Sequence, residues 1–190
     1  MAAETQPALQ LEDLHFRHPG LTAAAAAFYA EAAAVMLDGL HTSPVGFGAQ
    51  LNDGDVGLQA LAWRVPDPAV RRVVANLIDR IEQGAYSVAL AVVETTLGQV
   101  CLRRAAHGDG ADWLLVPVGG EESDDVELDL DRGDLVRLEV SGIASESDAT
   151  MRRRLHEKVD QLRDAAVPGL AWAAVVGFGR PRVWLASMET

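Results

Sequence analysis

The sequence predicts an α/β (α+β) fold in which a mixed central sheet is flanked by helices. Two observations predict it. Segments with apolar residues at helical spacing are interspersed with short apolar or alternating segments, and turn residues separate them. The predicted order is mainly helix, three strands, helix and further strand, which is typical of proteins whose helices cover a sheet. With 190 residues, 49% of them hydrophobic, the chain is long enough for one compact domain.

Residues 1–84 are expected to form an N-terminal extension that packs on the rest of the chain. A proline in the first turn favours a helix start, and alternating segments around a turn favour a hairpin. The expected elements are an irregular arm (1–20), an alanine-rich helix capped by Thr22 and running to about Leu40, a hairpin (45–52 and 56–65) around the turn NDGD, and a helix from Asp67-Pro68 to Gly84.

Residues 85–190 are expected to hold the core. Its first segment, AYSVALAVVETTL (85–97), is apolar on nearly every side, so we expect a buried helix whose only charge is Glu94. The elements expected after it are strands at QVCLRR (99–104), ADWLLVPV (111–118) and DLVRLEVSGI (134–143), an edge strand at VELDLD (126–131), a helix from Asp148 to about Ala166, and strands at LAWAAVVGF (170–178) and RVWLASM (182–188).

The strand at 134–143 and the helix after it are predicted to bring two charged side chains together. Strand side chains alternate between faces, so Arg137, Glu139 and Ser141 share one face. The helix buries a stripe made of Met151, Leu155, Val159, Leu162 and Ala166. Lys158, the only lysine of the chain, lies inside this stripe and is therefore expected to point toward Glu139. The alternative is a lysine at the edge of the stripe whose amine reaches solvent.

Charge and cysteine content limit the class of protein. A net charge of −12 disfavours a general nucleic-acid binder, but it does not exclude a nucleic-acid enzyme with local arginine patches. The single cysteine excludes an internal disulfide, and we find neither a secretory signal nor an apolar segment long enough to span a bilayer. We therefore expect a cytoplasmic protein without a membrane partner. The arginine patches are Arg71–Arg72, Arg103–Arg104, Arg152–Arg154 and the pair Arg180 and Arg182.

Three carboxylates and the lysine are candidates for one functional site. Glu94, Asp112 and Glu139 offer hard oxygen ligands that suit Mg²⁺ or Mn²⁺, and the amine of Lys158 suits a water or a phosphate. Each residue also has a structural alternative. Glu94 can be a buried glutamate bonded to a backbone amide or an arginine, and Asp112 can complete a turn after Gly110.

These residues and their order resemble the PD-(D/E)XK nuclease superfamily, and in particular divergent bacterial members of it. The resemblance covers about 85–186 and rests on the strings AVVETTLG, GADWLL and RLEVSG. It implies a restriction-endonuclease-like core in which Asp112 and Glu139 bind Mg²⁺ or Mn²⁺ and Glu94 assists. It also implies a nucleic-acid substrate.

One position departs from the superfamily pattern, and it leaves two functions open. Ser141 stands where a lysine normally follows the glutamate by two residues, but some members place that lysine on the next helix, where Lys158 lies. Arg137, Ser141 and Gln161 are then accessory residues. The first function is a metal-dependent phosphodiesterase, a nuclease with a migrated lysine. The second is an inactive nuclease-like fold that binds a protein partner or assembles as a homo-oligomer.

Overall fold

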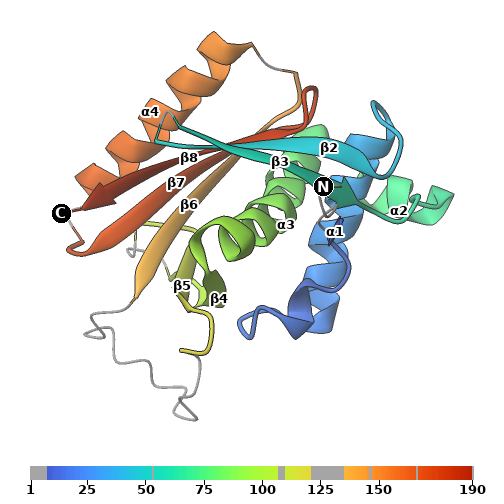
Figure 1. The fold of residues 1–190 in the computed structure, drawn as a ribbon. Coiled ribbons are helices and arrows are strands. Elements are labelled where there is room, and N and C mark those ends of the chain that lie inside the picture. Colours follow the sequence, from blue (N-terminus) through green and yellow to red (C-terminus); the bar gives the residue numbers. More distant parts are fainter. Residues whose placement is uncertain are drawn as a thin grey trace, which may run out of the picture.

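A computed structural model describes residues 8–52, 54–106, 110–120, 135–145, 147–165 and 167–189. It confirms the predicted fold class: helices flank a mixed sheet of eight strands in the order β1-β3-β2-β8-β7-β6-β5-β4 (Figure 1). The strands are β1 (Leu9–Gln10), β2 (Val45–Leu51), β3 (Gly54–Ala62), β4 (Gln99–Arg104), β5 (Trp113–Pro117), β6 (Val136–Ile143), β7 (Leu170–Gly177) and β8 (Arg182–Glu189). The helices are η1 (Leu14–Phe16), α1 (Ala23–Asp38), α2 (Pro68–Val73), α3 (Leu77–Leu97) and α4 (Asp148–Asp164).

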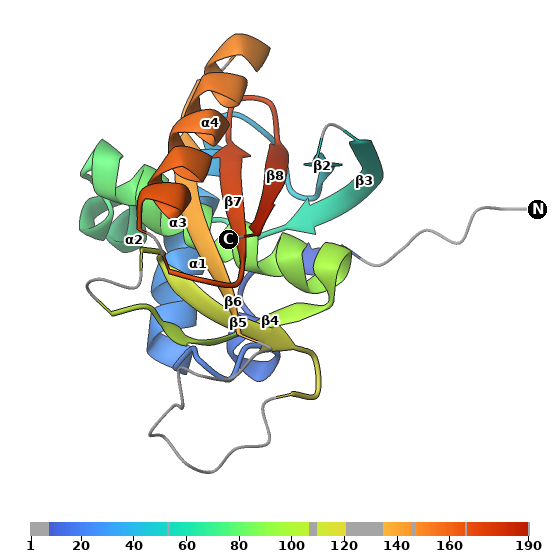
Figure 2. The same cartoon turned by 90° about the vertical axis from the view of Figure 1, so that its left-hand side faces the viewer.

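Helices cover both faces of the sheet, as Figures 1 and 2 show. The helix α4 connects the parallel strands β6 and β7 and packs on one face, because parallel neighbours need a crossover connection. The helix α3 packs on the other face, and α1 packs on α3. The alternation predicted for β6 follows from this arrangement. Val136, Leu138 and Val140 join the core that contains α3, whereas Ile143 packs with Met151 of α4.

The hairpin of the N-terminal region belongs to the same sheet as the C-terminal strands. The strands β2 and β3 are antiparallel, and β2 also runs parallel to β8, with Gly48 opposite Arg182. The alanine-rich helix α1 buries Ala26, Ala30 and Ala33 in the core it shares with α3. Within the described ranges, no helix is both long and apolar enough to cross a membrane.

The structure corrects the predicted boundary between the two central helices. The sequence suggests one helix that Gly84 ends and a second that starts at Ala85. Instead α2 ends at Val73, Asn76 caps α3, and Gly84 lies inside α3. A Cβ on Gly84 would stand 2.9 Å from the backbone of Ala33, so this glycine permits the close approach of α1 and α3. The edge strand predicted at 126–131 lies outside the described residues.

Candidate active site

An open edge of β6 provides the place where the candidate site forms. The ladder between β5 and β6 reaches Trp113 opposite Leu138, and it does not extend along β6 beyond that pair. Asp112 stands at this point, immediately before β5. Its backbone N–H donates to the carbonyl of Leu138 at 3.0 Å, and its Oδ2 accepts the N–H of Val140 at 2.8 Å. The carboxylate of Asp112 is therefore held against the part of β6 that β5 does not cover.

The second carboxylate, Glu139, meets the only lysine of the chain. Lys158 Nζ lies 2.6 Å from Glu139 Oε1, and the two side chains are 16% and 12% exposed. Lys158 reaches the sheet because it is on the inner side of α4, between Leu155 and Leu162, as the apolar stripe predicts. The contact therefore joins two elements that cover each other, at the strand edge where Asp112 lies.

Burial controls the protonation of Glu139. Burial raises the pKa of the Glu139 carboxyl above its usual value, and the neighbouring negative charge of Asp112 raises it further, while Lys158 acts in the opposite direction. The net direction is upward. Two carboxylates thus share a confined space with one ammonium group, and a cation placed between them would relieve their repulsion.

The helix α3 adds two polar residues to this group. The hydroxyl of Tyr86 lies 2.9 Å from Oε1 of Glu82 and 2.9 Å from Oδ1 of Asp112, so its one proton can be donated to either carboxylate. Arg104 Nη2 donates to the same hydroxyl oxygen at 2.9 Å. Burial, followed by the charge of Asp112, raises the pKa of Tyr86 far above its ordinary value, so the side chain remains a neutral phenol.

Arg104 lies over the aromatic residues next to Asp112. Its guanidinium carbon is 4.5 Å from the ring centre of Tyr86 and 5.0 Å from that of Trp113, which favours a cation–π contact. Its Nη2 is also 3.7 Å from Asp112 Oδ1. Arg104 therefore supports the Tyr86 hydroxyl and partly balances the charge of Asp112.

A glycine brings α3 close to the strand edge. A Cβ on Gly142 would lie 2.5 Å from the carbonyl oxygen of Ile81 and 2.6 Å from its Cγ2. Because nothing larger than hydrogen fits there, α3 approaches β6 directly. Glu82, the residue after Ile81, and Tyr86, one turn farther along α3, thereby reach the site.

These side chains surround one cavity of about 300 Å³. It lies where α3, α4 and the edge of β6 meet. A hollow of about 340 Å³ between α1 and the start of α2 is slightly larger, but it lacks a carboxylate–lysine pair. The polar residues that line the smaller cavity, besides Tyr86, are Glu82, Asp112, Glu139, Ser141, Arg154 and Lys158.

Glu94 does not line this cavity, although the sequence suggests it as the assisting acid. It follows Tyr86 by eight residues, which is about 12 Å along a helix. Its Oε2 lies 2.8 Å from Arg17 Nε and 3.3 Å from Nε2 of the buried His18. Burial opposes ionisation of Glu94, but its contacts with His18 and Arg17 outweigh it and lower the pKa of the carboxyl. Glu94 thus fastens the N-terminal arm to α3.

The three predicted accessory residues have different places. Ser141 lines the cavity, as expected from its position two residues after Glu139. Arg137 is almost fully buried and donates from Nη2 to the carbonyl of Val167 at 2.5 Å, and burial lowers its pKa. Gln161 is exposed on α4. Neither Arg137 nor Gln161 lines the cavity.

Glu82, Tyr86 and the role of Arg104 were not predicted from the sequence. Glu82 and Tyr86 are four residues apart, so they lie on one face of a helix, and a polar pair beside an apolar stretch could have identified them. The predicted helix boundary at Gly84 separated the two residues into different elements and hid this spacing.

The donor set of the cavity suits a divalent cation of the Mg²⁺ type. In the part of the chain that the structure describes, no group of three or more His, Cys, Asp or Glu side chains is placed so that it could hold a metal ion. Mg²⁺, however, commonly binds through one or two carboxylates and completes its shell with water and substrate phosphate. Asp112 and Glu139 offer two such carboxylates, and Glu82 lies next to them through Tyr86.

Comparison with other proteins adds no assignment. No protein-family model matches the chain, and searches of curated proteins and of solved structures find no significant match.

Proposed function

We propose that this protein is a divalent-metal-dependent phosphodiesterase that cleaves nucleic acid. The observation that carries the proposal is the contact of 2.6 Å between Lys158 and Glu139 in a cavity that also holds Asp112. The chain has sixteen basic residues, and its one lysine is the one that lies in this cavity. An ammonium group is a compact donor that can be placed beside a single oxygen, whereas arginine presents a wide fork.

Asp112 and Glu139 would hold Mg²⁺ or Mn²⁺, with Glu82 available through an intervening water. A bound divalent ion supplies charge stabilisation at a phosphate oxygen and lowers the pKa of a coordinated water. The fixed position of Asp112, held by Val140 and Tyr86, favours this role because a preorganised ligand needs little rearrangement.

Lys158 would orient the attacking water or stabilise the charge that develops on the phosphate oxygens. Its amine contacts Glu139, which keeps the ammonium group beside a candidate metal ligand. Arg154, on the same side of α4, lines the cavity and pairs with Glu157 at its half-exposed rim, where it can attract a phosphate group. Tyr86 would position Asp112, and Arg104 would support the Tyr86 hydroxyl.

A cleavage assay with matched acid variants tests the proposal. Wild-type protein is incubated with single- and double-stranded DNA and with RNA, in Mg²⁺, Mn²⁺ or EDTA. We expect cleavage with either metal, none in EDTA, and a loss of at least 100-fold in Asp112→Asn and Glu139→Gln. Asp160→Asn is the control, because Asp160 is an exposed acid on the outer side of α4. Cleavage that is equal in all four proteins would identify a contaminant and refute the proposal.

One observation favours a second candidate function, the binding of a protein partner or a second copy. Val73, Leu77 and Ile78 are exposed at the junction of α2 and α3, Ile78 by 74%, and Ile78 also lines the cavity. Exposed apolar groups that lie together favour protein contacts. Sedimentation velocity of wild type and of Ile78→Ser tests this: a self-associating wild type and a monomeric variant would support it. A cytoplasmic setting fits either function, because the only cysteine is a buried free thiol.

A further inference from the structure

A further hollow, of about 250 Å³, lies between α4 and the strands β8 and β2. The helix α4 packs on β6, β7 and β8, and β2 is the strand of the sheet that follows β8. The flank of α4 therefore forms one wall, β2 forms the other, and β8 forms the floor. We call this space the α4–β2 hollow, and its lining includes Gln50, Arg152, Leu155, His156 and Trp184.

The alternation of β2 places Gln50 in this hollow. Phe47 and Ala49 belong to the core that contains α3, so Gln50 lies on the opposite face of the sheet. In the parallel pairing of β2 with β8, Gln50 stands opposite Trp184. Trp184 faces α4, since it packs with Met151 of that helix. Gln50 and Trp184 are thus neighbours on the face of the sheet that carries α4.

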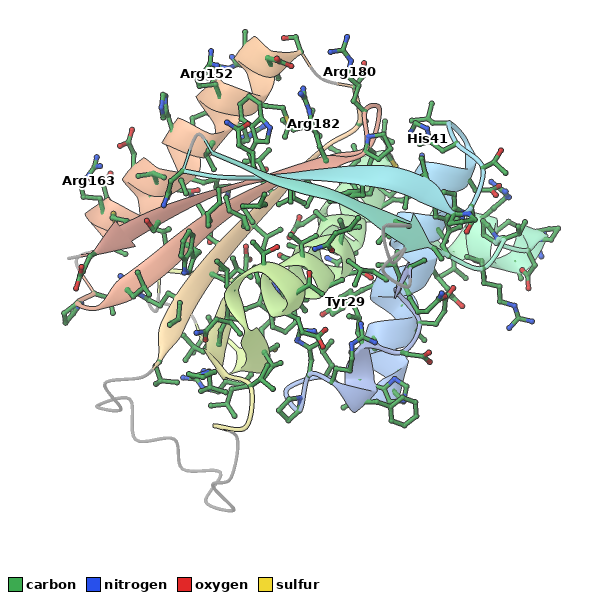
Figure 3. All side chains as sticks on the ribbon, viewed as in Figure 1. Tyr29, His41, Arg152, Arg163, Arg180 and Arg182 are labelled. Atoms are coloured by element: carbon green, nitrogen blue, oxygen red, sulfur yellow. The ribbon has the colours of Figure 1, made fainter. Side chains whose placement is uncertain are left out.

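Two residues of α4, Arg152 and His156, reach the hollow from its other wall. They are four residues apart, so they lie on one side of the helix. Arg152 extends from α4 (Figure 3), and its guanidinium carbon is 5.9 Å from the ring centre of Trp184. Leu155 packs against the same small cluster of apolar side chains as Trp184. The hollow therefore combines an apolar floor with polar groups on two walls.

The polar side chains of the hollow have hydrogen-bonding capacity that the described residues do not use. Within the described ranges, Gln50 and His156 make no side-chain hydrogen bond or ion pair, and Arg152 makes only its ring contact. The charges of Arg152 and Asp148 also act on each other, but the carboxylate of Asp148 is bonded to Arg182 at 2.8 Å. A ligand in the hollow can thus be bound without breaking a hydrogen bond of these three side chains.

The chemistry of the lining favours an anion. Among the described residues, no acidic side chain lines the hollow, although the chain has 28 acidic residues. The lining offers a guanidinium, an imidazole and an amide, each of which can donate hydrogen bonds. A phosphate monoester has three strongly accepting oxygens, so it can accept from both walls, and a guanidinium binds it through paired hydrogen bonds. The apolar surface of Trp184 and Leu155 suits an organic group attached to that phosphate.

We propose that the α4–β2 hollow binds a small organic phosphate monoester of the nucleoside monophosphate type. Arg152 and His156 would hold the phosphate, Gln50 a polar edge of the organic group, and Trp184 and Leu155 its apolar surface. The ligand must be small, because pockets for drug-sized molecules measure about 300–1,000 Å³. The inference does not depend on the proposed nuclease activity, since the hollow and the cavity around Lys158 share no described lining residue.

The test is a titration followed through the tryptophan side chains. Protein labelled with ¹⁵N is titrated in EDTA with AMP, UMP, inorganic phosphate or adenosine. The four indole N–H signals, assigned by Trp→Phe variants, separate Trp184 from the other tryptophans. The variant is Arg152→Gln, which changes an exposed side chain. The control is Arg153→Gln, which removes the same charge from the next residue, an arginine that lies 3.9 Å from Glu157 and outside the hollow.

We expect AMP and UMP to shift the Trp184 indole signal in a saturable way in the wild type and in Arg153→Gln. Arg152→Gln should bind both about tenfold or more weakly, because it loses charge-assisted hydrogen bonds to the phosphate. Adenosine and inorganic phosphate should each bind more weakly than AMP, because each supplies only half of the contacts. An unshifted Trp184 signal, equal affinity in the two arginine variants, or equal affinity for AMP and either of its halves would overturn the inference.

The same titration separates this inference from the proposed function. A mononucleotide contains no internucleotide phosphodiester bond, so cleavage cannot contribute to the signal. A loss of AMP affinity in Lys158→Met as large as that in Arg152→Gln would place the ligand in the cavity and overturn the inference. If the wild type binds AMP at Trp184 but cleaves no nucleic acid, the nuclease proposal fails and the α4–β2 hollow stands as a binding site.

Discussion

Lys158 Nζ and Glu139 Oε1 lie 2.6 Å apart, although their residues are 19 positions apart in the chain and belong to a helix and a strand. The strand β6 and the helix α4 follow one another directly, so α4 folds back over the strand that precedes it. Because of this return, the amine that contacts Glu139 comes from Lys158 on the helix. Ser141, two residues after Glu139 on the strand, has no amine. The lysine predicted from the apolar stripe thus contacts Glu139 and lines the cavity that Asp112 also lines.

Replacement of Lys158 should separate its charge from its packing. Lys158→Met keeps a long apolar stem beside Leu155 and Leu162 and removes the ammonium group. We expect Mg²⁺-dependent cleavage to fall by about 10²–10³-fold, the loss typical of a charge-stabilising donor. Lys158→Arg should also be impaired, because the guanidinium fork cannot replace a point donor. Single-turnover cleavage rates measure both effects.

The thermal stability of Lys158→Met provides its control. In EDTA we expect a loss of about 1–3 kcal/mol at neutral pH, because Glu139 then remains buried without the cation that contacts it. Asp160→Asn, on the exposed side of the same helix, should change stability little. Unchanged cleavage by a folded Lys158→Met protein would exclude the lysine from the reaction.

The raised pKa of Glu139 predicts how metal binding depends on pH. A divalent ion binds the carboxylate and competes with a proton, so Mn²⁺ affinity should fall as the pH is lowered through the raised pKa. The fall should begin at a higher pH than for an ordinary glutamate of pKa about 4.3. Titration calorimetry in two buffers of different ionisation heat should also detect proton release.

Stability without metal should show the opposite trend. A carboxyl whose pKa is higher in the folded state binds protons more tightly there, so this contribution stabilises the protein as the pH falls through the raised pKa. Glu139→Gln should lack both dependences, and Asp160→Asn should keep them. A Mn²⁺ affinity that varies with pH equally in Glu139→Gln would assign the dependence to another group.

The sequence predicts the sheet well because the strands around the site have local signals. The alternation of β6 and the apolar stripe of α4 are properties of ten to twenty consecutive residues, and they place Glu139 and Lys158 on facing surfaces. The turn sequence around Asn52 similarly predicts the hairpin of β2 and β3.

The overlooked part of the site depends on contacts between distant residues. In the sequence, Gly84 resembles a residue that ends a helix. In the structure it lies inside α3, where its lack of a side chain allows the contact with Ala33, and no local sequence pattern reveals this contact. Likewise, the sequence 85–97 is apolar on all sides, so it does not indicate which turn of α3 lies at the open edge of β6. The close approach of Gly142 to Ile81 determines which part of α3 lies at this edge. That part carries Glu82 and Tyr86 and not Glu94.

Glu94 should stabilise the fold without contributing to metal binding. Its pKa is lowered in the folded protein, so its stabilisation is fully present above the unfolded value of about 4.3 and is lost as the pH falls through the folded value. We expect Glu94→Gln to lose about 1–3 kcal/mol at pH 7 and to approach the wild type in acid. Urea unfolding from pH 3 to 7 measures this difference.

A matched comparison decides between the two roles suggested for Glu94. The folded Glu94→Gln protein should bind Mn²⁺ and cleave at wild-type rates at 25 °C, because the carboxylate contacts Arg17 and His18 outside the cavity. Glu139→Gln serves as the reference for a lost ligand. A drop in Mn²⁺ affinity of similar size in both variants would show that Glu94 contributes to metal binding.

The hydroxyl of Tyr86 should act on the reaction by positioning Asp112. Tyr86→Phe retains the ring, whose centre lies 5.5 Å from that of Trp113 and 5.6 Å from that of Tyr29, but it removes a donor to Asp112. Asp112 then keeps the N–H of Val140 and gains rotational freedom. We expect cleavage to fall about tenfold, mainly in kcat, with a stability loss of about 1 kcal/mol.

Tyr29→Phe is the control, because it deletes the hydroxyl of the neighbouring ring, which lies 3.5 Å from Arg104 Nη1 and outside the cavity lining. Both variants remove one hydroxyl close to Arg104, so a general effect on packing or on the arginine should appear in both. A loss specific to Tyr86→Phe, together with weaker Mn²⁺ binding, identifies the hydroxyl that holds Asp112. Equal kcat in the two folded variants would show that Asp112 is positioned by the backbone of β6 alone.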